Sequence, residues 1–133
     1  MLMKTKTYKL STEYRTLAEE VIKEVDSLNW LENVRIEYLE SQEDKTHNDK
    51  KVGGECIKVE DIYKTFIPLD FIIVVYAPNV ARMTREQRKQ LMHHELLHIG
   101  FNNTKEGRVF KIVHHDIEDF REIIELYGLD WAR

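Results

Sequence analysis

One stretch near the middle of the chain, residues 71–98, determines most of the predicted fold, and it reads FIIVVYAPNVARMTREQRKQLMHHELLH. Its first part, Phe71–Tyr76, is a continuous apolar run rich in β-branched residues, which predicts the most buried strand of the protein. Farther on, Thr84 is followed three residues later by Gln87, the pattern of a capping box. We therefore predict a helix from Thr84 to about Gly100, because glycine fits a C-terminal stop.

Two amphipathic patterns precede this stretch. Between Ser11 and Leu28 the apolar residues recur at intervals of three and four, which predicts a helix with one face on the core. Val34, Ile36 and Tyr38 then share one parity, which indicates a half-buried strand.

The remaining segments are predicted from weaker patterns. Residues 41–55 are polar, contain two successive glycines and have no periodicity, so we expect a loop, followed by a short strand over Cys56–Val59. Near the other end, apolar residues at intervals of three and four predict a C-terminal helix from about Asp116 to Tyr127. The segment before it, residues 108–113, fits either a strand or an extension of that helix.

Length and pattern together predict one domain of the α+β class. At 133 residues and 42% hydrophobic content, the chain has the size of a single unit, and we expect it to span residues 1–133. In this domain a small, mostly antiparallel sheet packs against the N-terminal helix and the helix that starts at Thr84, and a C-terminal helix follows.

Charge and cysteine content exclude several partners. The net charge of -4 is spread over interspersed acidic and basic residues, so neither nucleic acid nor an anionic membrane surface is expected to bind. The longest apolar stretch, Phe71–Ala77, is far shorter than the roughly 20 residues that cross a bilayer. Cys56 is the only cysteine and no apolar leader is visible, so we expect the protein to be located in the cytoplasm. We expect Cys56 to be a packing residue and not a reactive thiol.

The chemistry is concentrated in the pattern His-Glu-x-x-His at His94, Glu95 and His98. Residues four apart share one helix face, so both imidazoles could bind a single ion, while Glu95 is offset by about a hundred degrees and could touch the ion's bound water. Zinc lowers the pKa of that water to about 7 and polarises a carbonyl, and the carboxylate passes the proton to the leaving amine. We therefore predict a Zn²⁺ site with His94 and His98 as ligands and Glu95 as general base.

A catalytic zinc site usually has three protein ligands, and the third is expected downstream. Three candidates stand there, His114, His115 and Glu118. If residues 108–113 are extended, the two histidines point to opposite faces, so only one of them can meet the metal. The residues alone leave this choice open.

Several blocks of the sequence resemble the phage metallopeptidase family, small zincin-like proteins. The matching blocks, in chain order, are DFIIVV at residues 70–75, the metal-binding pattern within residues 87–99, HDIEDF at residues 115–120, and YGL followed by Trp131 at residues 127–131. The resemblance implies a compact α+β zincin-like fold, peptidase activity and a third metal ligand at His115.

The function predicted from the sequence is zinc-dependent hydrolysis of a peptide or protein substrate. The strand Phe71–Tyr76 is expected to form one wall of a groove, where the substrate could add as a further strand. The alternative is a zinc-binding interaction or regulatory module that no longer cleaves anything. An intact Glu95 favours the enzyme, because a structural metal site has no use for a general base.

Overall fold

The structure is a computed structural model that describes residues 6–114. With η marking 3-10 helices, its elements are β1 (Tyr8–Leu10), α1 (Thr12–Glu24), η1 (Asp26–Asn33), β2 (Ile36–Ser41), β3 (Thr46–His47), β4 (Lys50–Lys51), β5 (Gly54–Lys58), η2 (Asp61–Thr65), β6 (Phe71–Tyr76), α2 (Ala77–Val80), α3 (Arg85–Leu96), β7 (Ile99–Thr104) and β8 (Gly107–Ile112). The α+β class is therefore confirmed. The predicted C-terminal helix lies outside the described residues.

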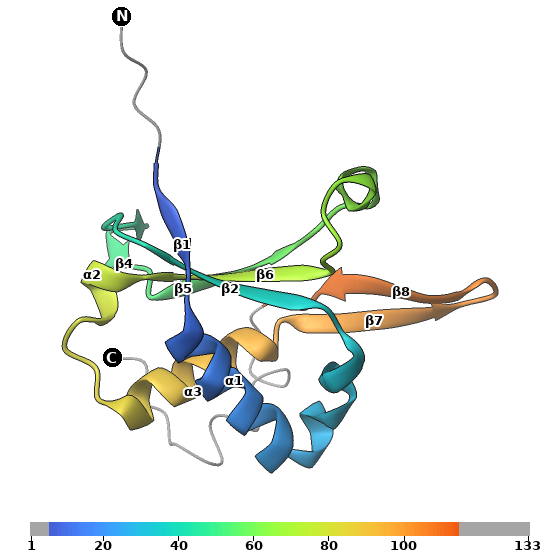
Figure 1. Cartoon of the computed structure of the whole chain (residues 1–133), viewed down its shortest axis with the longest axis horizontal. Helices are drawn as coiled ribbons and strands as arrows, with labels where there is room; N and C mark the ends of the chain where they lie inside the picture. The colour runs from blue at the N-terminus through green and yellow to red at the C-terminus, as the bar shows by residue number, and fades with distance from the viewer. Residues whose placement is uncertain (1–5, 115–133) are drawn as a thin grey trace, which may run out of the picture.

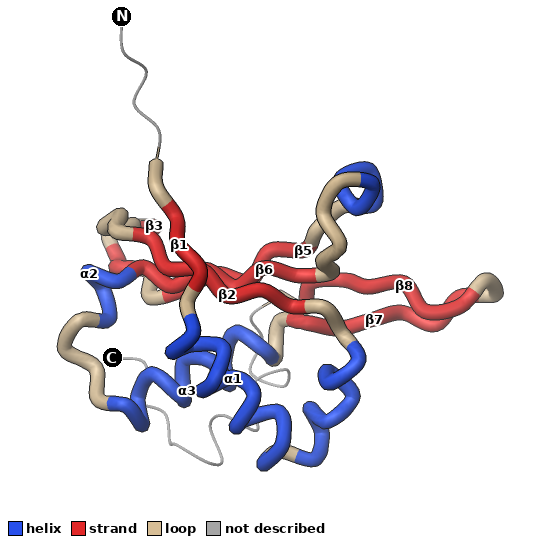
Figure 2. The backbone as a smooth tube through the Cα atoms, in the orientation of Figure 1, coloured by secondary structure: helices blue, strands red, loops and turns tan. Residues whose placement is uncertain are grey.

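The main sheet has four strands in the order β1-β2-β6-β5. The two outer pairings, β1 with β2 and β5 with β6, are antiparallel, and the central pairing of β2 with β6 is parallel. The helices α1 and α3 pack on each other and lie on one face of this sheet (Figure 1). Two small antiparallel hairpins, β3–β4 and β7–β8, complete the described part (Figure 2). Small and mostly antiparallel sheets were predicted, and this is what forms.

The strand β6 lies between β2 and β5 and has the bounds predicted from its apolar run. Phe71, Ile73 and Val75 are completely buried and belong to the core beneath the helices. None of the helices within residues 6–114 is both long and apolar enough to cross a membrane.

The helix α1 begins as predicted but ends earlier. The hydroxyl of Ser11 caps it by accepting a hydrogen bond from the backbone N–H of Tyr14 at 3.2 Å. The helix stops at Glu24 because Val25 takes an extended backbone and the Asn29 amide donates to the Val25 carbonyl at 3.3 Å. The chain then continues as η1, where Leu28 is still buried.

The predicted loop at residues 41–55 is wrong in part. A tight hairpin joins β3 to β4, and its two corner residues, Asn48 and Asp49, have φ values of 52° and 62°. Asparagine and aspartate tolerate this left-handed backbone better than most residues, which explains a turn that polarity alone does not reveal. The following strand, β5, starts at Gly54, inside the predicted loop.

The helix α3 has the predicted capping box and an unexpected end. Thr84 and Gln87 cap each other's backbone N–H groups at 2.9 and 3.1 Å. The helix ends at Leu96, four residues before the predicted stop at Gly100. Gly100 lies instead in β7, where a Cβ would stand only 2.7 Å from Cγ2 of Val113. This glycine therefore makes room for a neighbouring strand and does not terminate the helix.

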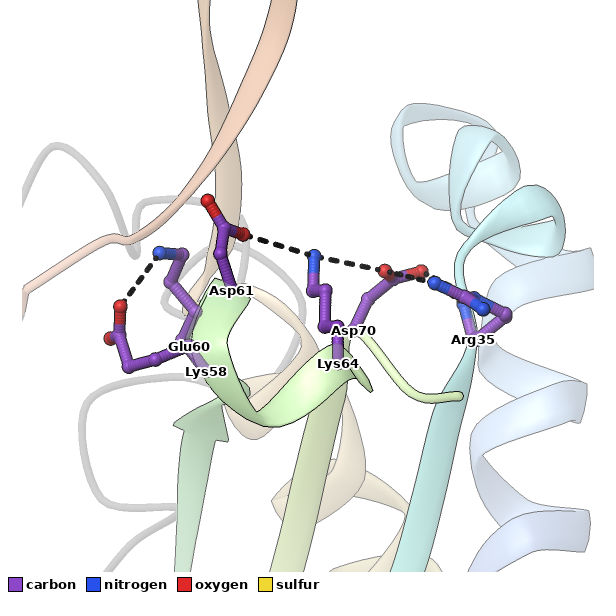
Figure 3. A network of polar contacts seen from close by, with 6 residues as sticks. All are labelled: Arg35, Lys58, Glu60, Asp61, Lys64 and Asp70. Atoms are coloured by element: carbon purple, nitrogen blue, oxygen red, sulfur yellow. Dashed lines mark hydrogen bonds and ion pairs between the residues drawn. The ribbon is translucent and has the colours of Figure 1, made fainter. Parts of the chain in front are cut away.

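The start of β6 is fixed by a buried carboxylate, Asp70, which is 6% exposed. Arg35 donates to it from the backbone nitrogen at 2.9 Å, from Nε at 3.3 Å and from Nη2 at 3.1 Å, and Lys64 Nζ lies 3.3 Å away (Figure 3). Burial favours a raised pKa for the Asp70 carboxyl, but the contacts with Arg35 and Lys64 outweigh burial and hold that pKa below its usual value. Asp70 thus ties the entry of β2 and the helix η2 to β6.

Candidate functional site

The three residues of the His-Glu-x-x-His pattern lie where α3 gives way to β7. His94 and Glu95 are in the last turn of the helix, and His98 follows Leu97, the C-cap residue. The prediction that the whole pattern lies inside the helix is therefore wrong at His98. The two imidazoles nevertheless come together, with ring centroids 5.1 Å apart and planes at 84°. Leu97 keeps helical dihedral angles, so the spacing of one turn is nearly preserved.

His98 is held by the strand that returns to it. Ile99 pairs with Ile112, and this register continues outward to His98 and Val113. The backbone N–H of Val113 donates to the His98 carbonyl at 2.7 Å. The carbonyl of Val113 in turn lies 2.6 Å from Nδ1 of the His98 ring. A carbonyl can only accept, so Nδ1 carries the proton and the lone pair of the neutral ring is on Nε2. Histidines that bind metals usually donate their other N–H to such a carbonyl.

Glu95 is a buried carboxylate, 3% exposed, between the His98 ring and the strand β5. Its Oε1 lies 4.0 Å from Nε2 of His98, and its Oε2 lies against Gly54. Burial raises the pKa of Glu95 to about 8, and the negative charge of Glu55 adds to the shift. Among residues 6–114, His98 is the only basic side chain within ion-pair distance of this carboxylate.

These groups fit a transition-metal cation. The site offers two neighbouring imidazole rings, one of them with its proton on Nδ1, and a buried carboxylate for which a nearby cation would be favourable. Within the described part of the chain, however, no group of three or more histidine, cysteine, aspartate or glutamate side chains could hold a metal ion. Two histidines alone are fewer than the three protein ligands of a usual catalytic zinc site.

The predicted third ligands follow directly on the strand that holds His98. The segment whose structure was left open from the sequence is a strand, because β8 spans Gly107–Ile112. His114 comes next after Val113 and its side chain is exposed. His115 and Glu118 lie outside the described residues, so the choice among the three stays a prediction.

The comparisons with known proteins add the family. A family model described as "Putative phage metallopeptidase" matches residues 6–133. The chain belongs to this family. No curated protein and no solved structure matches it. Membership of this family implies a metal ion.

Two neighbours of the site could not be assigned a role from the sequence. Gly54 lies against the Glu95 carboxylate, and the Val113 carbonyl orients His98. The doubled glycine was visible in the sequence but indicated only a loop.

Cys56, which was predicted to be a packing residue, lies next to the core. Burial raises the pKa of its thiol, and the charge of Glu95 adds a smaller effect. A thiol with a raised pKa is a poor nucleophile, which agrees with packing.

The expected peptide groove along β6 is wrong. This strand is paired on both sides, with β2 and with β5, so it has no edge to which another strand could add. The outer strand on the side of Glu95 is β5. A long apolar run predicts burial correctly, but burial in the middle of a sheet excludes strand addition.

Proposed function

We propose that this chain is a zinc-dependent peptidase in which His94, His98 and His115 hold the metal and Glu95 is the general base. The observation that supports it most is the His98 ring, which is oriented by the Val113 carbonyl at 2.6 Å and has the buried Glu95 carboxylate 4.0 Å from its Nε2. A histidine that only fills space in the core would not need a buried carboxylate beside it. Burying a carboxylate costs free energy unless a cation or a proton accompanies it, so the pair favours a functional site. Membership of a metallopeptidase family supports the same proposal.

The proposed ligand atoms support a transition metal such as zinc. Imidazole nitrogens suit zinc and other transition metals, whereas calcium and magnesium prefer shells made only of oxygen. When bound, zinc supplies Lewis-acid chemistry, because it lowers the pKa of a water molecule and polarises the scissile carbonyl.

The role of Glu95 is to move a proton. In the proposed reaction its carboxylate accepts a proton from the attacking water and later delivers it to the leaving amine. The pKa of Glu95 falls when a cation binds at the neighbouring imidazoles, because an opposite charge favours the ionised form. Its 3% exposure keeps bulk water away from the carboxylate, which strengthens its interactions with the reacting groups.

The third ligand is proposed to be His115. The pairing of Val113 with His98 returns the chain to the metal helix, and His115 follows two residues later. The exposed side chain of His114 favours His115 over its neighbour. Zinc content of His114→Ala, His115→Ala and Glu118→Ala distinguishes the three, because loss of a ligand weakens binding far more than loss of a neighbour. Full zinc retention in His115→Ala, with loss in another variant, would mean that the wrong residue was chosen.

The experiment that tests the function combines metal analysis with peptide cleavage. We expect about one zinc per chain in protein that has not met a chelator, cleavage of a peptide library, loss of cleavage with chelator and recovery with zinc. Protein without a transition metal would contradict the proposal. Bound zinc without any cleavage would instead identify the non-catalytic zinc-binding module.

A further inference from the structure

The strand β5 makes an unusually close approach to Glu95 at its first residue. Gly54 pairs with Val75 of β6, and its Cα faces the end of α3. A Cβ placed on Gly54 would stand 3.3 Å from Oε2 of Glu95 and 3.6 Å from the carboxylate carbon. This separation is tighter than ordinary packing, so a side chain at this position would require a neighbouring group to shift.

The space at this position is limited from two sides. The same Cβ would stand 3.1 Å from the Val74 carbonyl oxygen, which belongs to the backbone of the central strand and cannot rotate away. An added methyl group would therefore be pressed between the sheet and the carboxylate of Glu95. Because the sheet is held by its ladder of hydrogen bonds, the Glu95 side chain has to move by a few tenths of an ångström.

The neighbouring glycine is a natural contrast. A Cβ on Gly53 would lie 3.5 Å from Cγ1 of Val80 and 3.7 Å from the methyl groups of Leu91, which are ordinary packing distances. Neither glycine has a positive φ, so alanine introduces no backbone strain at either position. The two positions differ mainly in what the methyl group would touch.

We propose that Gly54 is a positioning residue for the general base, an inference that rests on the proposed function. The two carboxylate oxygens of Glu95 have different neighbours, since Oε2 rests on Gly54 and Oε1 faces Nε2 of His98 at 4.0 Å. The backbone of β5 thus sets how far the carboxylate stands from the metal-binding ring. Any displacement at Oε2 changes the position of Oε1 relative to His98, and with it the alignment for proton transfer.

The catalytic test compares Gly54→Ala with Gly53→Ala in the zinc-loaded enzyme. We expect Gly54→Ala to lower kcat about tenfold with KM and zinc content unchanged, because misplacement of a catalytic group affects the reaction more than binding. Gly53→Ala should keep kcat within about twofold. Full kcat in Gly54→Ala, or an equal loss in both variants, would overturn the proposal.

A second measurement does not depend on activity. Urea unfolding of the zinc-free protein measures how much Gly54→Ala lowers the free energy of unfolding, once in the wild type and once in the Glu95→Ala background. The same two measurements are made for Gly53→Ala. The cost of Gly54→Ala should fall clearly once the carboxylate is gone, whereas the cost of Gly53→Ala should be the same in both backgrounds. If Gly54→Ala does not fold, folding restored by Glu95→Ala supports the proposal.

Equal costs of Gly54→Ala in both backgrounds, or no folding in either, would assign the conflict to the Val74 carbonyl and overturn the proposal. A wild-type protein that binds no zinc and cleaves nothing would refute the proposed function. The unfolding cycle would still decide whether Gly54 positions Glu95.

Discussion

Within residues 6–114, the carboxylates of Asp70 and Glu95 are buried to nearly the same extent but have opposite surroundings. Asp70, 6% exposed, receives hydrogen bonds from Arg35 and an ion pair from Lys64, and its pKa is lowered. Glu95, 3% exposed, has the His98 ring at 4.0 Å as its nearest basic neighbour in the described structure, and its pKa is raised to about 8. A carboxylate with its own cations holds elements together, whereas one that lacks them is suited to a proton or a metal.

The largest effect on the free energy of unfolding should appear at the Glu95 site when zinc is added. A ligand that binds only the folded state at a concentration of 100 times its Kd stabilises that state by about 2.7 kcal/mol. We expect a shift of this order in the free energy of unfolding of wild-type protein, and none in His98→Ala. Chemical unfolding with and without zinc measures it, and an equal shift in both proteins would place the metal away from His98.

Removing the charge of Asp70 should be the next largest effect. Asp70→Asn leaves Arg35 and Lys64 without their anion, and we expect a loss of about 2 kcal/mol in the free energy of unfolding. Glu95→Gln in zinc-free protein should cost clearly less, because no pair with lysine or arginine is broken. Equal costs in urea unfolding would mean that the two carboxylates do not differ as described.

The contribution of Lys64 can be separated by a matched pair of lysines. Lys64 Nζ lies 3.3 Å from Asp70, 3.8 Å from the exposed Asp61 and 5.3 Å from the centre of the Phe110 ring (Figure 3). Among residues 6–114, Lys58 has its ion pair with the exposed Glu60 (Figure 3). Lys64→Ala should cost about 1 kcal/mol and Lys58→Ala less than about half of that, because surface ion pairs contribute little. If Lys58→Ala proves the more costly change, the buried pair does not dominate this cluster.

The smallest effect is the pH dependence of the Asp70 contacts. The pKa of Asp70 is lowered in the folded state, so its contribution is complete above the ordinary aspartate value of about 3.9 and is lost as pH falls through the folded-state value. The stability difference between wild type and Asp70→Asn should therefore be constant near neutral pH and shrink in acid. Urea midpoints measured from pH 7 downward test this. A stability difference that grows in acid would mean that the pKa of Asp70 is raised in the folded state and would contradict the account.

The parts of the fold that the sequence predicts are those decided by neighbours along the chain. The strand β6, the buried stripe of α1 and the capping box at Thr84 depend on residues within one or two turns of each other. The end of α3 was missed because it depends on Val113, which pairs with His98 across 15 positions. Such a contact leaves no periodic signal.

The candidate site divides in the same way. His94, Glu95 and His98 are recognisable from their spacing in the sequence, but the approach of Gly54 to Glu95 arises from the register of β5 on β6. The contrast between the two carboxylates was equally invisible, because Arg35 is 35 positions before Asp70. Spacing identifies the residues that could react, and tertiary contacts set their protonation and position.

The most direct test of the account measures kcat, zinc content and stability of Glu95→Gln beside Asp70→Asn. If Glu95 is the general base, Glu95→Gln should lose activity by about a thousandfold while it keeps its zinc and its fold. Asp70→Asn should be less stable yet keep a kcat near that of the wild type at temperatures where it is folded. Wild-type cleavage by Glu95→Gln, or loss of its zinc, would contradict the assignment of Glu95 as the base.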